Sequence, residues 1–168
     1  MSGIVLMRIE GGDEAFRSLS KRAQDRVTRE AHRAVGEYWD AEYKMRHLGP
    51  GAAERYGYQE RTERYLRRKE YGSRATWRIK GGRDDALIFS GQTLQAVRQR
   101  MIPRAFPTRV TIQMPTPTYI TMRPKPGKNR TPPNLGEELT RVIPEEEQRL
   151  GEVWIATAER MTQEELDR

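Results

Sequence analysis

Residues of the kind that carry chemistry are few in this sequence, and none has the partners that a catalytic or metal site needs. His32 and His47 have no cysteine or second histidine at metal-ligand spacing, and a metal site needs three or four convergent donors. Ser90 lacks the glycines two residues away on either side that define a nucleophile elbow, so we interpret it as a helix N-cap. Asp84-Asp85 is an isolated acidic pair. We therefore predict no enzyme activity, no cofactor and no metal.

The residues that stand out are arginines and tyrosines, concentrated between Arg55 and Arg83. Ten basic and three acidic residues give this stretch a charge of +7, which equals the net charge of the whole 168-residue chain. Arginine binds carboxylates and phosphates through planar, paired hydrogen bonds, and Tyr and Arg are enriched at protein interfaces. We predict a surface that contacts protein or phosphate. Its candidate residues are Arg55, Tyr58, Arg61, Arg64, Tyr65, Arg67, Arg68, Tyr71, Arg74 and Trp77.

Two extended segments are predicted to reach neighbouring subunits. Residues 51–86 are too many for an ordinary connection, because loops beyond about 12–15 residues are usually functional or disordered. We expect an extended basic arm there, with a short helix over 62–71. Residues 123–133 (RPKPGKNRTPP) carry four prolines and four basic residues, which is typical of an extended connector.

The charge then reverses, since residues 134–168 carry ten acids and four arginines, a net charge of −6. Unlike surfaces on one chain suit head-to-tail contacts between identical subunits. The same pattern equally fits an acidic end that neutralises the arm within one monomer. Both interpretations stay open at this point.

A long helix is predicted over 13–46, as part of the body from which the arm and the connector extend. Apolar residues recur at intervals of three or four from Phe16 to Met45, with one late gap. At 1.5 Å per residue the helix would be about 50 Å long. A helix of that length overhangs a compact core, so we expect it to pack on a neighbouring molecule.

Shorter elements complete the prediction. A helix of about ten residues follows Ser90, with Leu94 and Val97 facing inward. A strand is predicted at 109–114, where polar and apolar residues alternate. A second strand is predicted at 118–122, and the two together are expected to form a hairpin.

The acidic end is predicted to form two helical faces. Leu135 to Ile143 make the first, Pro144 breaks it or begins the next helix, and Leu150 to Met161 continue the second. The tail is expected to fray from Thr162. The predicted fold class is α+β, in a single domain over 1–168: a long N-terminal helix packed on a small antiparallel sheet, an extended basic arm, and a C-terminal helix.

Composition limits the size of the core. Hydrophobic residues make up 35% of the chain and charged residues 33%, against about 25% charged in an average globular chain. Such chains are often subunits that become fully ordered in an assembly. The absence of cysteine excludes disulfides and thiolate metal sites. We expect no signal peptide at the N-terminus and no membrane-spanning segment.

The segment from Leu87 to Leu94 (LIFSGQTL) resembles the apolar–Ser/Thr-Gly segment of a family of small tailed-bacteriophage proteins. The family comprises the minor tail, tail-completion and head–tail connector (neck) proteins. The order of elements is also similar: a long helix, a Tyr/Arg/Lys-rich loop, the Ser/Thr-Gly helix start, a hairpin, and a Pro-containing link into a C-terminal helix. The corresponding pieces here are 13–46, 55–83, 87–98, 108–122 and 131–161.

The resemblance implies a non-enzymatic virion protein of the neck or tail, present in the host cytoplasm during assembly. It implies a homo-oligomeric ring, often of six, that contacts adjacent neck and tail proteins. The rival interpretation is a nucleic-acid-binding protein that uses the same basic arm, whose affinity should fall steeply with salt. The sequence contains no recognition-helix, zinc or RNA-binding signature, and a toxin or nuclease would need a His/Asp/Glu constellation that is missing.

Overall fold

The computed structural model describes residues 14–71, 92–113 and 135–168. Its internal contacts divide the chain into two compact units. Of the described residues, 14–41, 101–113 and 142–168 belong to the α2/α8 unit, and 42–71, 92–100 and 135–141 belong to the η1 unit. The single domain over 1–168 stays a prediction. The connector at 123–133, the strand at 118–122, Ser90 and Asp84-Asp85 lie outside the described residues.

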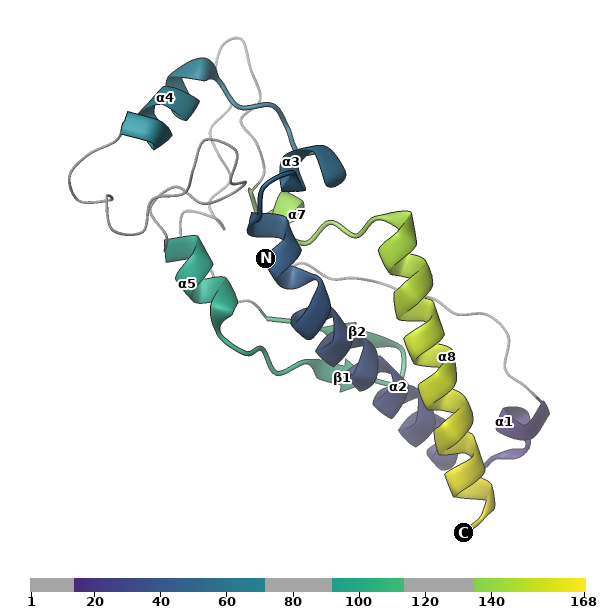
Figure 1. Ribbon diagram of the computed structural model, residues 1–168. Helices are drawn as coiled ribbons and strands as arrows, with labels where there is room; N and C mark the ends of the chain where they lie inside the picture. The colour runs from purple at the N-terminus through teal and green to yellow at the C-terminus, as the bar shows by residue number, and fades with distance from the viewer. Residues whose placement is uncertain (1–13, 72–91, 114–134) are drawn as a thin grey trace. The chain divides into compact units, whose positions relative to one another are not determined.

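The α2/α8 unit pairs two long helices with a small hairpin (Figure 1). Its elements are α1 (Glu14–Ser18), α2 (Lys21–Glu42, of which Glu42 belongs to the η1 unit), β1 (Arg104–Phe106), β2 (Arg109–Thr111) and α8 (Pro144–Leu166). Helix α2 buries one stripe of residues at intervals of four, as its sequence predicted. The stripe is Ala23, Val27, Ala31, Val35 and Trp39.

The two long helices share one hydrophobic cluster. Val27 and Ala31 of α2 meet Ala158 of α8, and the partly buried Phe16, Leu19, Trp154 and Met161 pack around them.

The prediction of one continuous helix over 13–46 is wrong at both ends. The helix breaks at Leu19-Ser20, where the Ser20 hydroxyl accepts a hydrogen bond from the Ala23 backbone N–H (3.3 Å). A serine at this position caps the first turn of a new helix, so α2 begins at Lys21. At its other end α2 stops at Glu42, and a 3-10 helix follows. The break at Leu19-Ser20 is caused by the capping side chain of Ser20, which the spacing of apolar residues does not reveal.

The hairpin is antiparallel, and Ala105 pairs with Val110 at its centre. The strand predicted at 109–114 is confirmed over 109–111, but its described partner is 104–106, which precedes it. Helix α2 packs on this hairpin through Gly36, where an added Cβ would lie 2.6 Å from Cβ of Pro103 and 2.9 Å from Cγ2 of Val110. The absence of a side chain at Gly36 lets the two elements approach closely.

Helix α8 begins at Pro144, the first helical position, which confirms one of the two predicted roles of that proline. The prediction that the tail frays from Thr162 is wrong. The helix continues to Leu166, and Thr162 is buried. Arg26 of α2 forms an ion pair with the nearly buried Glu165 (2.6 Å), which holds the last turn of α8 against α2.

The η1 unit surrounds a short 3-10 helix. Its elements are η1 (Lys44–Leu48), α3 (Ala52–Arg55), α4 (Glu63–Tyr71), α5 (Gln92–Arg98) and α7 (Leu135–Leu139). Helices α3, α5 and α7 contact η1. Leu48, Val97 and Leu139 form the buried core, with Met45 and Leu94 against it. The predicted inward positions of Leu94 and Val97 are therefore confirmed.

The fold is mostly helical with one two-stranded antiparallel sheet in the described part, which agrees with the predicted α+β class. None of the described helices combines the length and the apolar character that crossing a membrane would require.

Candidate interaction surface

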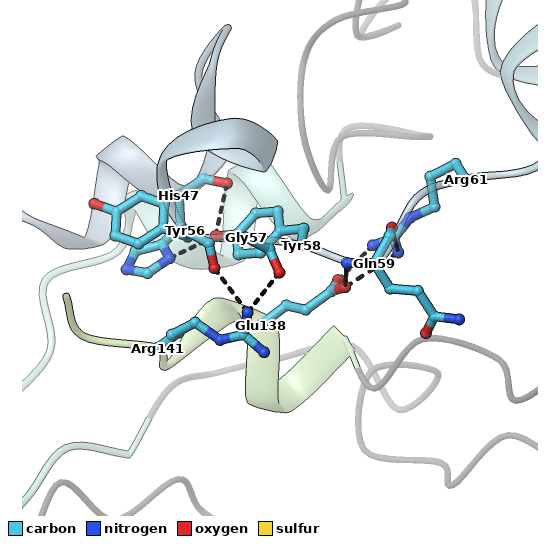
Figure 2. A network of polar contacts seen from close by, with 8 residues as sticks. All are labelled: His47, Tyr56, Gly57, Tyr58, Gln59, Arg61, Glu138 and Arg141. Atoms are coloured by element: carbon cyan, nitrogen blue, oxygen red, sulfur yellow. Dashed lines mark hydrogen bonds and ion pairs between the residues drawn. The ribbon is translucent and has the colours of Figure 1, made fainter.

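The structure separates the predicted interaction residues into an anchored group and an exposed group, both in the η1 unit. Tyr58 and Arg61 belong to a polar network that also contains Glu138 and Arg141 (Figure 2). Arg64 and Arg67 lie exposed on α4. We call the network of His47, Tyr56, Gly57, Tyr58, Gln59, Arg61, Glu138 and Arg141 the Glu138 clasp.

The carboxylate of Glu138 is the centre of the clasp. It is only 3% exposed. It accepts hydrogen bonds from the Gln59 backbone N–H (2.9 Å) and from Nη1 of Arg61 (3.1 Å), and Nη2 of Arg61 bonds its second oxygen. Paired bonds from one guanidinium to one carboxylate are strong and fix the relative orientation of the groups. Arg61 is therefore engaged by Glu138 of the same chain.

Arg141 holds the same segment at a second point. Its Nη1 donates to the carbonyl oxygens of Tyr56 (2.7 Å) and Gly57 (2.6 Å). Gly57 has a φ of +59°, a left-handed conformation that glycine adopts without steric cost. The two bonds depend on this turn, because it places successive carbonyl groups toward one guanidinium.

Aromatic rings close the other side of the clasp. The rings of His47 and Tyr56 stack with centroids 4.0 Å apart, and both residues are buried. The Tyr58 hydroxyl lies 2.6 Å from Nδ1 of His47. Burial lowers the pKa of His47 to about 4, against a smaller opposing effect of the Glu138 backbone. The imidazole is therefore uncharged at neutral pH, and the Tyr58 hydroxyl can donate to it.

The clasp shows that the segment predicted as an extended arm begins inside the unit. Ala52 and Tyr56 are buried, and residues 52–55 are helical. Within the described residues, the anchoring partner of the basic segment is the acidic α7 region of the same unit. This contact corresponds to the alternative in which the acidic end neutralises the arm within one chain, and Arg61 is the residue that makes it.

Helix α4 follows the clasp and presents the exposed group. Its first turn is stabilised by the Thr62 hydroxyl, which accepts a hydrogen bond from the Tyr65 backbone N–H (3.2 Å). Arg67 pairs with Glu63 one turn earlier (3.3 Å), as the spacing predicted. Arg64 and Arg67 are exposed, and Tyr65 is half-buried.

The remaining predicted residues are placed as follows. Arg55 is exposed at the end of α3, with its guanidinium carbon 6.0 Å from the centre of the Tyr56 ring. Arg68 and Tyr71 belong to α4. Arg74 and Trp77 lie outside the described residues.

Of the eight members of the clasp, only Tyr58 and Arg61 were among the predicted interaction residues. The prediction missed Tyr56, Gly57 and Gln59 within the basic segment, and His47, Glu138 and Arg141 outside it. Glu138 is one of ten acids in a charged run, and its charge does not distinguish it from the others. Its position could have done so, because it lies next to the core residue Leu139 in a short helix.

Among the described residues, no group of three or more His, Cys, Asp or Glu side chains could hold a metal ion. Comparison of the chain with protein-family models, with curated proteins and with solved structures finds no match.

Proposed function

We propose that the protein is a structural subunit of a tailed-phage neck or tail, and that it forms a ring through contacts between copies. The observation that carries the proposal is the division of the basic segment in the η1 unit. Glu138 anchors Arg61 in the interior, whereas Arg64 and Arg67 of the adjoining helix remain exposed. An exposed cationic helix that adjoins an anchored segment is suited to a protein contact, because fewer residues must be ordered when a partner binds.

Two further observations support this function. The order of elements follows the resemblance to phage neck and tail proteins: a long helix, a basic segment, a small hairpin and a C-terminal helix. The hydrophobic clusters that the described residues form in the two units are also small, and small cores are common in subunits that gain stability from assembly.

The first experiment is a mass measurement of the purified protein by mass photometry, with negative-stain images of any oligomer. We expect a discrete ring. The variant R64E/R67E should lose the ring and keep the circular dichroism spectrum of the wild type. The matched control is R98E/R100E, which reverses two other exposed arginines of the same unit and should assemble normally.

The outcomes separate this function from its rival. A wild-type protein that stays monomeric at all concentrations contradicts the proposal. Tight binding of short DNA duplexes that weakens steeply with salt, abolished in R64E/R67E, would favour a nucleic-acid-binding protein instead.

A further inference from the structure

The α2/α8 unit carries a stripe of arginines along α2. Arg22, Arg26, Arg29 and Arg33 are all exposed. At 100° per residue they fall within about 60° of one another around the helix axis. The buried Ala31 lies on the opposite side, so the stripe faces away from the core of the unit.

The arginines of this stripe differ in how far they are engaged within the unit. Arg26 pairs with Glu165 (2.6 Å) and Arg33 with Glu30 (2.8 Å), and both keep about half of their side chains exposed (50% and 47%). In the part of the chain that the structure describes, neither Arg22 nor Arg29 makes an ion pair. The stripe therefore has charge available for an external partner.

Helix α8 carries an acidic stripe of the same kind. Glu145, Glu152 and Glu159 are exposed and fall within about 40° of one another around the axis. They lie opposite Leu150 and Trp154, which face the core. Glu152 also pairs with the exposed Arg149 one turn earlier (2.6 Å), a solvent-exposed contact that is weak and easily exchanged.

We infer that the arginine stripe of α2 binds the glutamate stripe of α8 on a second copy of this chain. The inference rests on the proposed function, and it adds a second contact between copies to the one proposed at α4. Each copy presents one stripe of each sign, so every contact joins unlike surfaces and leaves both stripes of a chain usable at once. Such head-to-tail contacts generate a ring when the rotation between copies closes.

The spacing of the charges supports the match. Arg22 and Arg29 are seven residues apart, and so are Arg26 and Arg33. The glutamates repeat at the same interval, from Glu145 to Glu152 and from Glu152 to Glu159. Seven residues correspond to about 10.5 Å along either helix. Two helices that cross at a shallow angle of about 20° can therefore bring successive opposite charges together without a change of register.

A phosphate backbone is the other occupant that an arginine stripe could accept. The second copy is favoured because the same unit supplies an acidic stripe with the matching interval. The test therefore exchanges the charges between the two stripes and measures assembly directly.

The experiment uses two full-length variants, R22E/R29E and E152R/E159R, in sedimentation velocity at low and physiological salt. Each alone should weaken self-association by about tenfold or more, because attractive pairs become repulsive. An equimolar mixture of the two should regain wild-type assembly, since every contact in an alternating oligomer then joins unlike charges. A single chain with all four reversals should also assemble. Circular dichroism and thermal melting identify any variant that fails to fold.

Each outcome has one interpretation. Normal assembly of either variant alone, or a mixture that fails to assemble, overturns the inference. If both variants assemble normally while R64E/R67E does not, the inference is overturned, the proposed function survives, and the contact at α4 is the one that assembly needs. A wild-type chain that never assembles removes both proposals. Loss of DNA binding in R22E/R29E, with assembly unchanged, would assign the stripe to phosphate and overturn the inference.

Discussion

Arg61 and Glu138, separated by 77 residues in the sequence, form a paired ion bond in the interior of the η1 unit. Their side chains are only 16% and 4% exposed. Glu138 thus engages Arg61 within the chain, whereas Arg64 and Arg67 stay exposed. The contribution of Glu138 to folding can be measured independently of assembly.

Removal of the carboxylate at the centre of the clasp should destabilise the η1 unit strongly. The variant E138A leaves the buried Arg61 guanidinium without its partner, which typically costs about 3–5 kcal/mol. Urea denaturation followed by circular dichroism measures this loss. The control E137A changes the exposed neighbouring glutamate and should alter the free energy of unfolding by less than about 0.5 kcal/mol. Equal effects of the two variants would contradict the assigned role of Glu138.

The free energy of unfolding should decrease as the pH falls, because His47 is buried uncharged. Burial lowers its pKa to about 4 in the folded chain, whereas the unfolded value is about 6.5. Between pH 6.5 and pH 4, His47 is protonated in the unfolded chain but not in the folded one. The contribution of His47 to the free energy of unfolding is therefore fully present above pH 6.5 and is lost as the pH falls toward 4. The difference corresponds to on the order of 3 kcal/mol.

The measurement for His47 is a series of urea denaturations from pH 7 to pH 4. The variant H47Q removes this titration and should show a shallower decline than the wild type. His32, whose pKa burial also lowers, remains in both proteins and contributes equally. Parallel curves for the two proteins would show that His47 is not the responsible group.

Glycine positions provide a matched pair of tests for the packing of α2 on the hairpin. G36A places a Cβ 2.6 Å from Cβ of Pro103, and overpacking of this kind costs about 1–3 kcal/mol. G151A adds a Cβ on α8 where no atom lies within 4 Å. It should stabilise by about 0.5–1 kcal/mol, since alanine favours a helix interior. Thermal melting compares them, and a neutral G36A would contradict the close approach.

The C-terminal turns should matter for stability. A chain that ends at Met161 loses the buried Thr162 and the ion pair between Arg26 and Glu165. We expect a lower melting temperature than that of the full chain. A chain that ends at Leu166 retains both features and serves as the control. If the two truncated chains melt together, the last turns are dispensable and the sequence-based expectation of fraying was right.

Local patterns predicted much of this fold. The apolar stripe of α2, the inward faces of Leu94 and Val97, and the start of α8 at Pro144 all follow from residues within a few turns of one another. The break at Leu19-Ser20 could not be predicted in this way. Leu19 fits the apolar spacing of a continuous helix, and the break is marked only by the side chain of Ser20, which caps the next helix.

Contacts distant in sequence were beyond the same reasoning. The strand at 109–111 was recognisable by its alternation. Its partner at 104–106 lies only two residues earlier, but three residues are too few to show an alternation of their own. The orientation of Arg61 was likewise hidden, since a charged run does not show which of its members is carried into a core. The exposed stripes on α2 and α8 follow from simple helical geometry once the buried faces are known.

The clasp also has a consequence for how this chain tolerates change in length. The contact between Arg61 and Glu138 closes a loop that contains all the residues between them. The entropic cost of closing a flexible loop rises only logarithmically, by about 0.6 kcal/mol for each doubling of its length. An epitope tag inserted between the elements of this stretch, and not within α4, α5, β1 or β2, should therefore leave the contact between Arg61 and Glu138 intact.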